Sequence, residues 1–268
     1  MYLCDCHTHT RISQDSQAPL ARMVCAAENA GLSELCVTDH SDLVTNEGNP
    51  VTSFDWPAAL AQFHAVQSSG GLTLRLGLEL GSAPYDPDTA RRILAGGGDE
   101  LDFVLGSLHN WLGVRDNHDL YFTHFGDLAL CRQAVENCLT NTWTLVTRCA
   151  DCYDSLAHII YPLRYVKRDG NDLDLADYED QVRAIFTEVA RTGHAMEVNT
   201  NRGRSLADWI PLLRWFRECG GELVTLGSDA HRPEDVGLGI SAALELLREA
   251  GFTHVTTFEK RRPVLHKI

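Results

Sequence analysis

Short apolar runs and amphipathic segments alternate along the whole chain. Seven of the apolar runs have the length and composition of buried strands. They lie at residues 2–6, 34–38, 72–78, 101–106, 155–160, 195–198 and 223–227. The pattern therefore predicts strands spread over the full length of the sequence.

The segments between these runs carry apolar residues every three or four positions, as amphipathic helices do. Gly31 offers a stop for the first helix. Ser205 and Asp208 have the spacing of a capping box, which predicts a helix start there, and two glycines at residues 220–221 would end that helix. The clearest apolar sets are Leu20, Met23, Val24 and Ala27, and Tyr178, Val182, Ile185 and Val189.

Strands that alternate with helices pair in parallel, so the pattern predicts an α/β fold. Seven strands predict a barrel of the (β/α)7 type, one unit short of the eight-unit form. No Pro/Ser/Gly-rich linker or block of charge divides the sequence. We therefore expect one domain over residues 1–268.

The net charge of the chain limits the classes of molecule that it can bind. A formal net charge of -14 argues against broad binding to nucleic acid, but bound divalent cations would still allow a small anionic substrate. We expect neither a membrane span, because no run of about 18 apolar residues occurs, nor a signal peptide. Nine cysteines without an export signal predict reduced thiols and a cytoplasmic protein. Cys149 and Cys152 are interpreted as ordinary thiols, because no second pair completes a four-sulfur site.

Residues of metal-ligating type lie at or just after the C-terminal end of every predicted strand. Active sites of α/β barrels are assembled at that face from several strand ends. Residues far apart in the sequence would therefore meet in one pocket. In chain order these residues are His7 and His9, Asp39 and His40, Glu79, His109, His158, Glu197 and Asn199, and Asp229 and His231.

Neutral imidazoles and carboxylates are the ligands that zinc, manganese and iron prefer. His7 and His9 lie two residues apart, on the same side of an extended segment, and Glu79 could bridge two ions about 4 Å apart. A lone buried histidine is more often a satisfied core residue, but coincidence does not explain the whole set. The other six histidines are interpreted as structural or solvated, with His118 and His124 near enough to line the pocket.

The strand-end residues lie in motifs that resemble the PHP (polymerase and histidinol phosphatase) family, in its histidinol-phosphate phosphatase branch. The motifs follow one another in order over nearly the whole chain. The resemblance implies a distorted (β/α)7 TIM-like barrel that holds up to three divalent ions. The motifs are Asp5-Cys6-His7-Thr8-His9-Thr10, Thr38-Asp39-His40, Gly77-Leu78-Glu79, Gly106-Ser107-Leu108-His109, Ala157-His158, Glu197-Val198-Asn199-Thr200 and Gly227-Ser228-Asp229-Ala230-His231.

The resemblance also implies how the ligands are shared among the ions, which we expect to be zinc, manganese or iron. Asp15 lies in a loop after the first motif, where some relatives have a histidine. The expected catalytic residues are His7, His9, Glu79, Asp229 and His231. The first ion would be held by His7, His9, Glu79 and Asp229, the second by Glu79, His109 and His158, and the third by Asp15, His40 and His231.

The reaction implied by the resemblance is hydrolysis of a small phosphomonoester, with histidinol phosphate first. A hydroxide held between the first two ions would attack phosphorus. Asp5, Asp39 and Glu197 could orient ligand imidazoles. Arg164 could contact the phosphate, and a surface arginine paired with a carboxylate is an equal alternative.

Three other functions compete with this one. A phosphodiesterase or nuclease of the same family is disfavoured by the acidic charge and the lack of a basic, aromatic-rich stripe. A non-catalytic metal-stabilised module is disfavoured because every ligand position is intact. An amidohydrolase would need a bridging lysine, whereas Glu79 stands at the corresponding strand end. The sequence leaves a homo-oligomer open.

Overall fold

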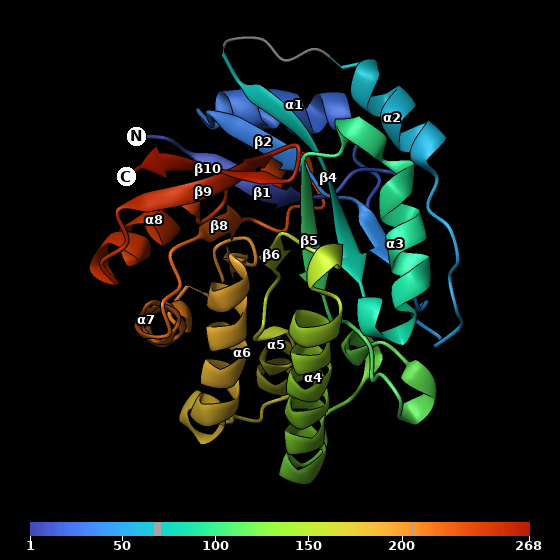
Figure 1. Ribbon diagram of the computed structural model, residues 1–268, viewed down its shortest axis with the longest axis vertical. Helices are drawn as coiled ribbons and strands as arrows, with labels where there is room; N and C mark the ends of the chain where they lie inside the picture. The colour runs from blue at the N-terminus through green and yellow to red at the C-terminus, as the bar shows by residue number, and fades with distance from the viewer. Residues whose placement is uncertain (67–70, 205) are drawn as a thin grey trace.

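The centre of the molecule is a parallel sheet that curves nearly into a barrel (Figure 1). The computed structural model describes residues 1–66, 71–204 and 206–268. Its strands pair in the order β1 (Cys4–Thr8), β2 (Glu34–Val37), β4 (Thr73–Gly81), β5 (Phe103–Ser107), β6 (Ser155–Leu156), β7 (Ala195–Asn199) and β8 (Val224–Gly227).

Backbone bonds between the first and last strands of this order nearly close the barrel. The Asp229 N–H donates to the His7 carbonyl at 2.9 Å, and the His9 N–H donates to the Ala230 carbonyl at 2.8 Å. A short strand that the sequence did not predict, β3 (His40–Asp42), pairs with the C-terminal half of β4. The predicted α/β fold and distorted (β/α)7 barrel are confirmed.

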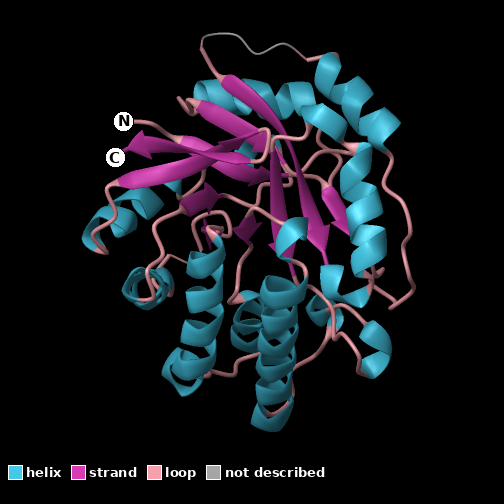
Figure 2. Ribbon diagram, viewed as in Figure 1, coloured by secondary structure: helices cyan, strands magenta, loops and turns pink. Residues whose placement is uncertain are grey.

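Helices cover the outside of the barrel (Figure 2). The apolar set that begins at Leu20 is buried in the first helix, as its spacing predicted. Among the described residues, no helix combines the length and apolarity that crossing a membrane requires. The helices are α1 (Leu20–Asn29), α2 (Trp56–His64), α3 (Pro87–Gly96), α4 (Leu128–Arg148), α5 (Tyr161–Arg168), α6 (Glu179–Thr192), α7 (Trp209–Glu218) and α8 (Ile240–Glu249).

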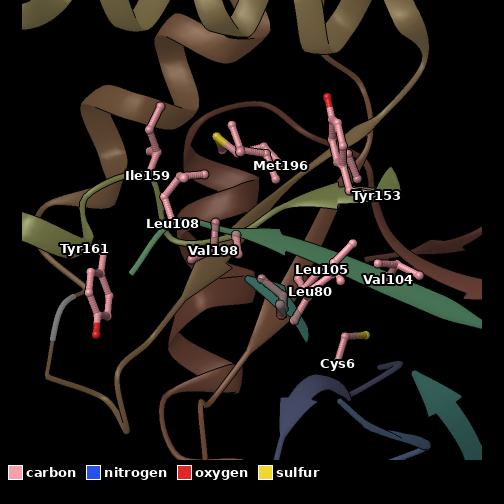
Figure 3. Packing of buried hydrophobic residues seen from close by; sticks show 14 of the residues in the cluster. Cys6, Leu80, Val104, Leu105, Leu108, Tyr153, Ile159, Tyr161, Met196 and Val198 are labelled. Atoms are coloured by element: carbon pink, nitrogen blue, oxygen red, sulfur yellow. The ribbon is translucent and has the colours of Figure 1, made fainter. Parts of the chain in front are cut away.

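The core lies between the strands and this helical layer, because parallel strands are covered on both faces. Leu80, Leu105 and Val198, from three different strands, are fully buried and belong to one cluster (Figure 3). Burial of each such side chain contributes about 1.5–3 kcal/mol relative to exposure. This packing holds the strand ends, and the polar residues on them, in fixed positions.

Two local predictions differ from the structure. The predicted strand 155–160 ends at Leu156, and the apolar residues that follow are buried in a turn before α5. Pro162 lies in the first turn of α5, where the missing N–H costs nothing, and favours this helix over a longer strand. The predicted capping box includes Ser205, which lies outside the described residues. Helix α7 begins at Trp209 with Asp208 at its N-cap position, but the Asp208 side chain makes no cap hydrogen bond and accepts one from Lys167 Nζ at 2.8 Å.

The sequence did not predict an antiparallel hairpin of β9 (His254–Glu259) and β10 (Arg262–Lys267). Its turn residues Lys260 and Arg261 both have positive φ, 48° and 59°, a conformation usually signalled by Asn or Gly. The Lys260 N–H donates to Asp102 Oδ1 at 3.0 Å, and Arg261 pairs with Asp154 at 3.0 Å. Asp102 and Asp154 precede β5 and β6, so the hairpin covers the N-terminal end of the barrel.

Phe258 anchors this hairpin, and its replacement measures how much the buried ring contributes to the stability of the protein. Its ring stacks on Phe103 with centroids 5.1 Å apart. We expect Phe258→Ala to lower the free energy of unfolding by about 3–5 kcal/mol, because it removes a buried ring and leaves a cavity. Leu265→Ala, in the same hairpin but exposed, is the matched control and should change it by about 0.5 kcal/mol or less. Equal urea midpoints for the two variants would show that the ring contact is not what fixes the hairpin.

Candidate metal centre and active site

Glu79, near the C-terminal end of β4, is the centre of the polar cluster and is fully buried. Its two carboxylate oxygens face different imidazoles. Around Oε2, at 3.1 Å each, lie His7 Nε2 and His40 Nδ1. Around Oε1 lie His109 Nε2 at 3.1 Å and His158 Nε2 at 2.9 Å. This division is the arrangement that a carboxylate needs in order to bridge two ions.

The end of β1 directs two histidines to the same place. A register shift between Asp5 and Thr8 interrupts the pairing with β2 here, and the intervening Thr8 turns away to donate to the Cys36 carbonyl at 2.9 Å. His7 Nε2 and His9 Nε2 lie 3.7 Å and 3.6 Å from Asp229 Oδ1. The strand and the loop after β8 therefore share one pocket.

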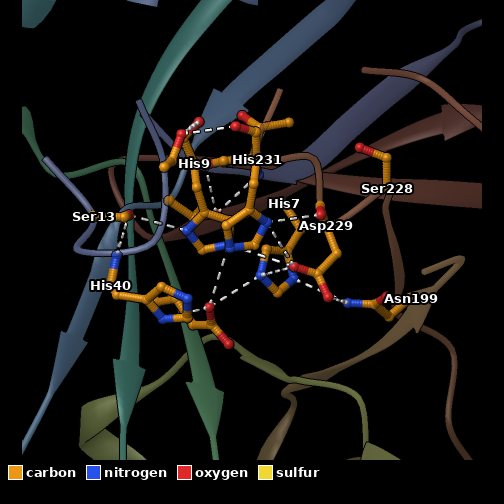
Figure 4. Close-up of polar contacts among 12 residues, drawn as sticks. His7, His9, Ser13, His40, Asn199, Ser228, Asp229 and His231 are labelled. Carbon is orange, nitrogen blue, oxygen red and sulfur yellow. Dashed lines mark hydrogen bonds and ion pairs between the residues drawn. The ribbon is translucent and has the colours of Figure 1, made fainter. Parts of the chain in front are cut away.

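His9 lies between two further imidazoles (Figure 4). Its ring centroid is 4.2 Å from that of His40 and 4.1 Å from that of His231. Asp15 Oδ2 completes this group, 2.9 Å from His231 Nε2 and 3.5 Å from His40 Nε2. Asp15 is about half exposed, so this side of the cluster faces the opening.

All nine residues predicted as ligands meet in this cluster. Three groups of residues resemble the predicted sets, and within each group the potential ligand atoms lie within 4.8 Å of one another. The group that corresponds to the third predicted set contains His9, which the prediction assigned to the first ion only. These groups are His7, His9 and Glu79; Glu79, His109 and His158; and His9, His40 and His231.

The three carboxylates predicted to orient imidazoles behave differently. Glu197 Oε1 contacts His7 Nδ1 directly at 2.6 Å. Asp39 accepts from the Ser13 hydroxyl at 2.7 Å, and this hydroxyl lies 3.2 Å from His9 Nδ1. Asp5 was predicted wrongly. Among the described residues it contacts no imidazole, because its oxygens accept the N–H groups of residues 228 and 237 and the hydroxyl of Ser228, and so tie β1 to the last loop.

Asp42 is a carboxylate of the cluster that the sequence interpretation missed. Its Oδ1 lies 2.8 Å from His109 Nδ1, and its Oδ2 lies 3.3 Å from His40 Nδ1. A side chain at Gly81 would displace the Asp42 carboxylate, because a Cβ there would lie 1.7 Å from Asp42 Oδ1. Its position two residues after His40, the spacing of the first motif, was the available signal.

Arg164 is not a surface residue. Its guanidinium is buried and donates from Nη1 to Asp229 Oδ2 at 3.1 Å and from Nη2 to Asn199 Oδ1 at 2.7 Å. Among the described residues, its buried Nε has no hydrogen-bond partner, and the same is true of Arg202 Nε. Arg202 has a φ of 57° in the loop after β7, and no pattern in the sequence indicated it.

A cavity of about 910 Å³ opens over the cluster. His118 and His124 do not line it, contrary to the prediction, because both side chains point to solvent. The same loop contributes Asp119 and Tyr121 instead. Cations and aromatic rings are prominent in the lining, which includes Arg164, Arg168, Arg202, Arg204, Arg232, Phe122, Tyr161 and Tyr165.

The electrostatics of the cluster favour cations. Burial would raise the pKa of the Glu79 carboxyl, but His7 and His40 among other imidazoles hold this pKa well below its ordinary value. Burial and the nearby imidazoles of His231 and His40 lower the pKa of His9, which therefore stays neutral. Among the described residues, no well-aligned hydrogen bond reaches the buried His9 Nε2 or His40 Nδ1, although Glu79 Oε2 lies 3.5 Å and 3.1 Å from them. Carboxylates outnumber the single guanidinium of Arg164, so the donor set fits divalent metals; these carboxylates are Asp15, Asp42, Glu79, Glu197 and Asp229.

Comparison with known proteins identifies the family. The model of the PHP domain matches residues 5–201, more than half of the 268-residue chain. The chain belongs to the PHP domain family.

Two curated relatives span nearly the same length. A protein of Clostridium acetobutylicum named "Probable histidinol-phosphatase" is 28% identical over 96% of this chain and 97% of its own. A protein of the same name from Deinococcus radiodurans is 30% identical over 95% and 96%. These relatives place the chain among phosphoric monoester hydrolases that resemble histidinol phosphatases, as predicted.

A crystal structure of histidinol phosphate phosphatase from Lactococcus lactis has the same fold. It superposes with a TM-score of 0.82 at 24% identity and covers 98% of each chain. That crystal structure contains zinc, L-histidinol and phosphate.

Proposed function

We propose that this protein hydrolyses a small phosphomonoester, with L-histidinol phosphate as the first candidate, at a centre of three divalent ions. The observation that carries the proposal is the division of four imidazoles between the two oxygens of Glu79 beneath a cavity lined by arginines. The named activities of full-length relatives support the same reaction.

The proposed ligand sets follow the three groups of the cluster. Zinc, manganese and iron suit these imidazoles and carboxylates. Bound ions would neutralise phosphate oxygens and lower the pKa of an attacking water toward ~7. In this proposal His7, His9, Glu79, Asp229 and His231 are catalytic through the ions that they hold. The sets are His7, His9, Glu79 and Asp229; Glu79, His109 and His158; and Asp15, His40 and His231.

Residues around these sets keep them in place. Glu197 holds His7 Nδ1, which leaves Nε2 directed toward the centre. A Cβ at Gly227 would lie 2.4 Å from both Glu197 Oε1 and the Cβ of His7, so the close approach of β1, β7 and β8 requires glycine. Asp42 holds His109 Nδ1 in the same way, which leaves His109 Nε2 directed toward Glu79.

Arg164 and Arg202 are proposed to bind the phosphate. Both line the cavity, and each has a buried Nε–H that no atom of the described residues accepts. An anion in the cavity would supply the missing acceptor. Arg164 also donates to Asp229, a proposed metal ligand, so phosphate binding at Arg164 would affect the position of Asp229.

We expect Arg164→Ala to raise KM for phosphomonoesters at least tenfold, because a hydrogen bond to a charged group contributes about 1.5–3 kcal/mol. Arg164→Lys should recover part of the loss, since it keeps the charge but not the paired donors. Arg191→Ala, on the exposed face of α6, is the control and should leave both kinetic constants unchanged. Steady-state phosphate release measures the effect, and an unchanged KM in Arg164→Ala would remove this residue from the site.

The proposed activity is tested by a screen of the purified, metal-loaded protein. The substrates are L-histidinol phosphate, sugar phosphates, nucleoside monophosphates and bis(p-nitrophenyl) phosphate. We expect the highest kcat/KM for L-histidinol phosphate and little release from the diester. Preferred cleavage of the diester would favour a phosphodiesterase, and no turnover of any compound would favour a non-catalytic module.

A further inference from the structure

Helix α4 carries a row of exposed residues on the side that faces away from the barrel. Its other side packs on the core through residues such as Ala134, Cys138 and Leu145. Figure 1 shows this helix in the outer layer, beside α6. The exposed residues are spaced by four, three and four positions, so they lie one above another on the helix surface. We call this row the α4 stripe, and it consists of Glu136, Thr140, Trp143 and Thr147.

The middle of α4 lacks the charges that a solvated helix face usually carries. Residues 137–147 contain no Asp, Glu, Lys or Arg, although the chain has a formal net charge of -14. Trp143 lies in this segment and is 46% exposed. Tryptophan is enriched and charge is depleted at the centres of protein–protein interfaces. The composition of the α4 stripe is therefore typical of a contact surface.

The threonines of this face are less polar than their residue type suggests. The Thr147 hydroxyl donates to the Trp143 carbonyl at 2.6 Å, and the Thr144 hydroxyl donates to the Thr140 carbonyl at 3.2 Å. Because these hydroxyls are satisfied inside the helix, the side chains offer their methyl groups to a partner. The face around Trp143 is therefore suited to packing against another helix of the same kind.

The α4 stripe is complementary to itself in an antiparallel arrangement. Its centre lies between residues 141 and 142, so a two-fold axis at this point places Thr140 against Trp143 of the second copy. The same axis brings Glu136 close to the level of Arg148 of the second copy. Glu136 and Arg148 are exposed, and neither forms an ion pair among the described residues. Two acidic chains repel each other in general, whereas this face offers an uncharged centre and opposite charges at both ends.

We infer that α4 packs antiparallel against α4 of a second copy of this chain and so forms a homodimer. Trp143 lies at the centre of the contact, and a pair of Glu136 with Arg148 lies at each end. The face of one helix makes a small interface, so we expect a dissociation constant of about 1–100 μM. None of the four residues of the stripe lines the cavity over the metal cluster, so the inference is independent of the proposed function.

Sedimentation velocity of the metal-loaded protein, from about 1 to 200 μM, tests the contact. We expect the wild type to show a concentration-dependent equilibrium between monomer and dimer. Trp143→Glu should raise the dissociation constant at least thirtyfold, because it places a charge at the centre of the interface and removes the largest side chain there. Leu265→Glu adds the same charge at an exposed apolar residue of the β9–β10 hairpin, and this control should leave the dissociation constant unchanged.

Exchange of the two charges tests the antiparallel pairing. Glu136→Arg and Arg148→Glu should each raise the dissociation constant at least fivefold, since each changes two contacts in a symmetric dimer. The double variant has the net charge of the wild type and should restore its dissociation constant. If net charge alone governed association, Glu136→Arg would strengthen it. A wild type that stays monomeric at every concentration, a dimer that Trp143→Glu does not weaken, or a double variant as weak as the single ones would overturn the inference.

Discussion

Replacement of Glu79 with glutamine is expected to lower kcat for phosphomonoesters by about 10³-fold or more. The substitution keeps the shape of the side chain but removes the charge that faces His7 and His40 on one oxygen and His109 and His158 on the other. An amide cannot bridge two cations as a carboxylate does. Loss of bound cations removes several kcal/mol of transition-state stabilisation, and each 1.36 kcal/mol is tenfold in rate.

Measurements of metal content and folding distinguish a loss of activity caused by lost metal from one caused by misfolding. Metal analysis of Glu79→Gln should show fewer ions per chain than wild type, while far-ultraviolet circular dichroism stays the same. Glu222→Gln changes an exposed carboxylate by the same chemistry and should retain full activity and full metal content. A Glu79→Gln protein with wild-type turnover would refute the bridging role.

Removal of metal by a chelator is expected to abolish turnover and to lower the thermal midpoint of unfolding. The cluster contains buried carboxylates in excess of its one guanidinium, and cations that bind this folded arrangement would stabilise it. An ion at 100 times its Kd contributes about 2.7 kcal/mol to stability. For a chain of this size that difference corresponds to a decrease of roughly 5–10 °C.

Restoration with single metals follows from the same account. Zinc, manganese or iron added back one at a time should recover both activity and the thermal midpoint, because all suit imidazole and carboxylate ligands. Magnesium prefers oxygen ligands and should recover less. If the chelated protein, shown to be metal-free, keeps full turnover, the reaction does not use these ions.

The sequence was sufficient to predict the barrel because its strands and helices carry regular patterns. Buried parallel strands read as continuous apolar runs, and the helices repeat their apolar residues with the helical period. The hairpin of β9 and β10 was not predicted, because its turn at Lys260 and Arg261 has positive φ angles but contains no glycine or asparagine to indicate them. The strand expected at 155–160 was too long, since the same apolar residues pack equally well in a turn that leads into α5.

The candidate site was predictable where ligand types stand at strand ends. That rule brought together Glu79 and six histidines from five other strand ends. It said little about the rest of the cavity, whose lining comes from α5 and from loops. Asp119 and Arg202 occupy such loops, and their positions depend on local hydrogen bonds and positive φ angles that no periodicity reveals. Asp5 illustrates the converse error, because a carboxylate beside a metal motif can accept backbone N–H groups and a serine hydroxyl in place of an imidazole.

Anomalous diffraction from crystals of the zinc-loaded protein tests the central claim most directly. We expect zinc at the cluster, with separate ions within about 2.0–2.2 Å of each carboxylate oxygen of Glu79 and imidazoles of His7 and His158 among their ligands. Zinc bound elsewhere, with Glu79 touching no ion, would contradict the account.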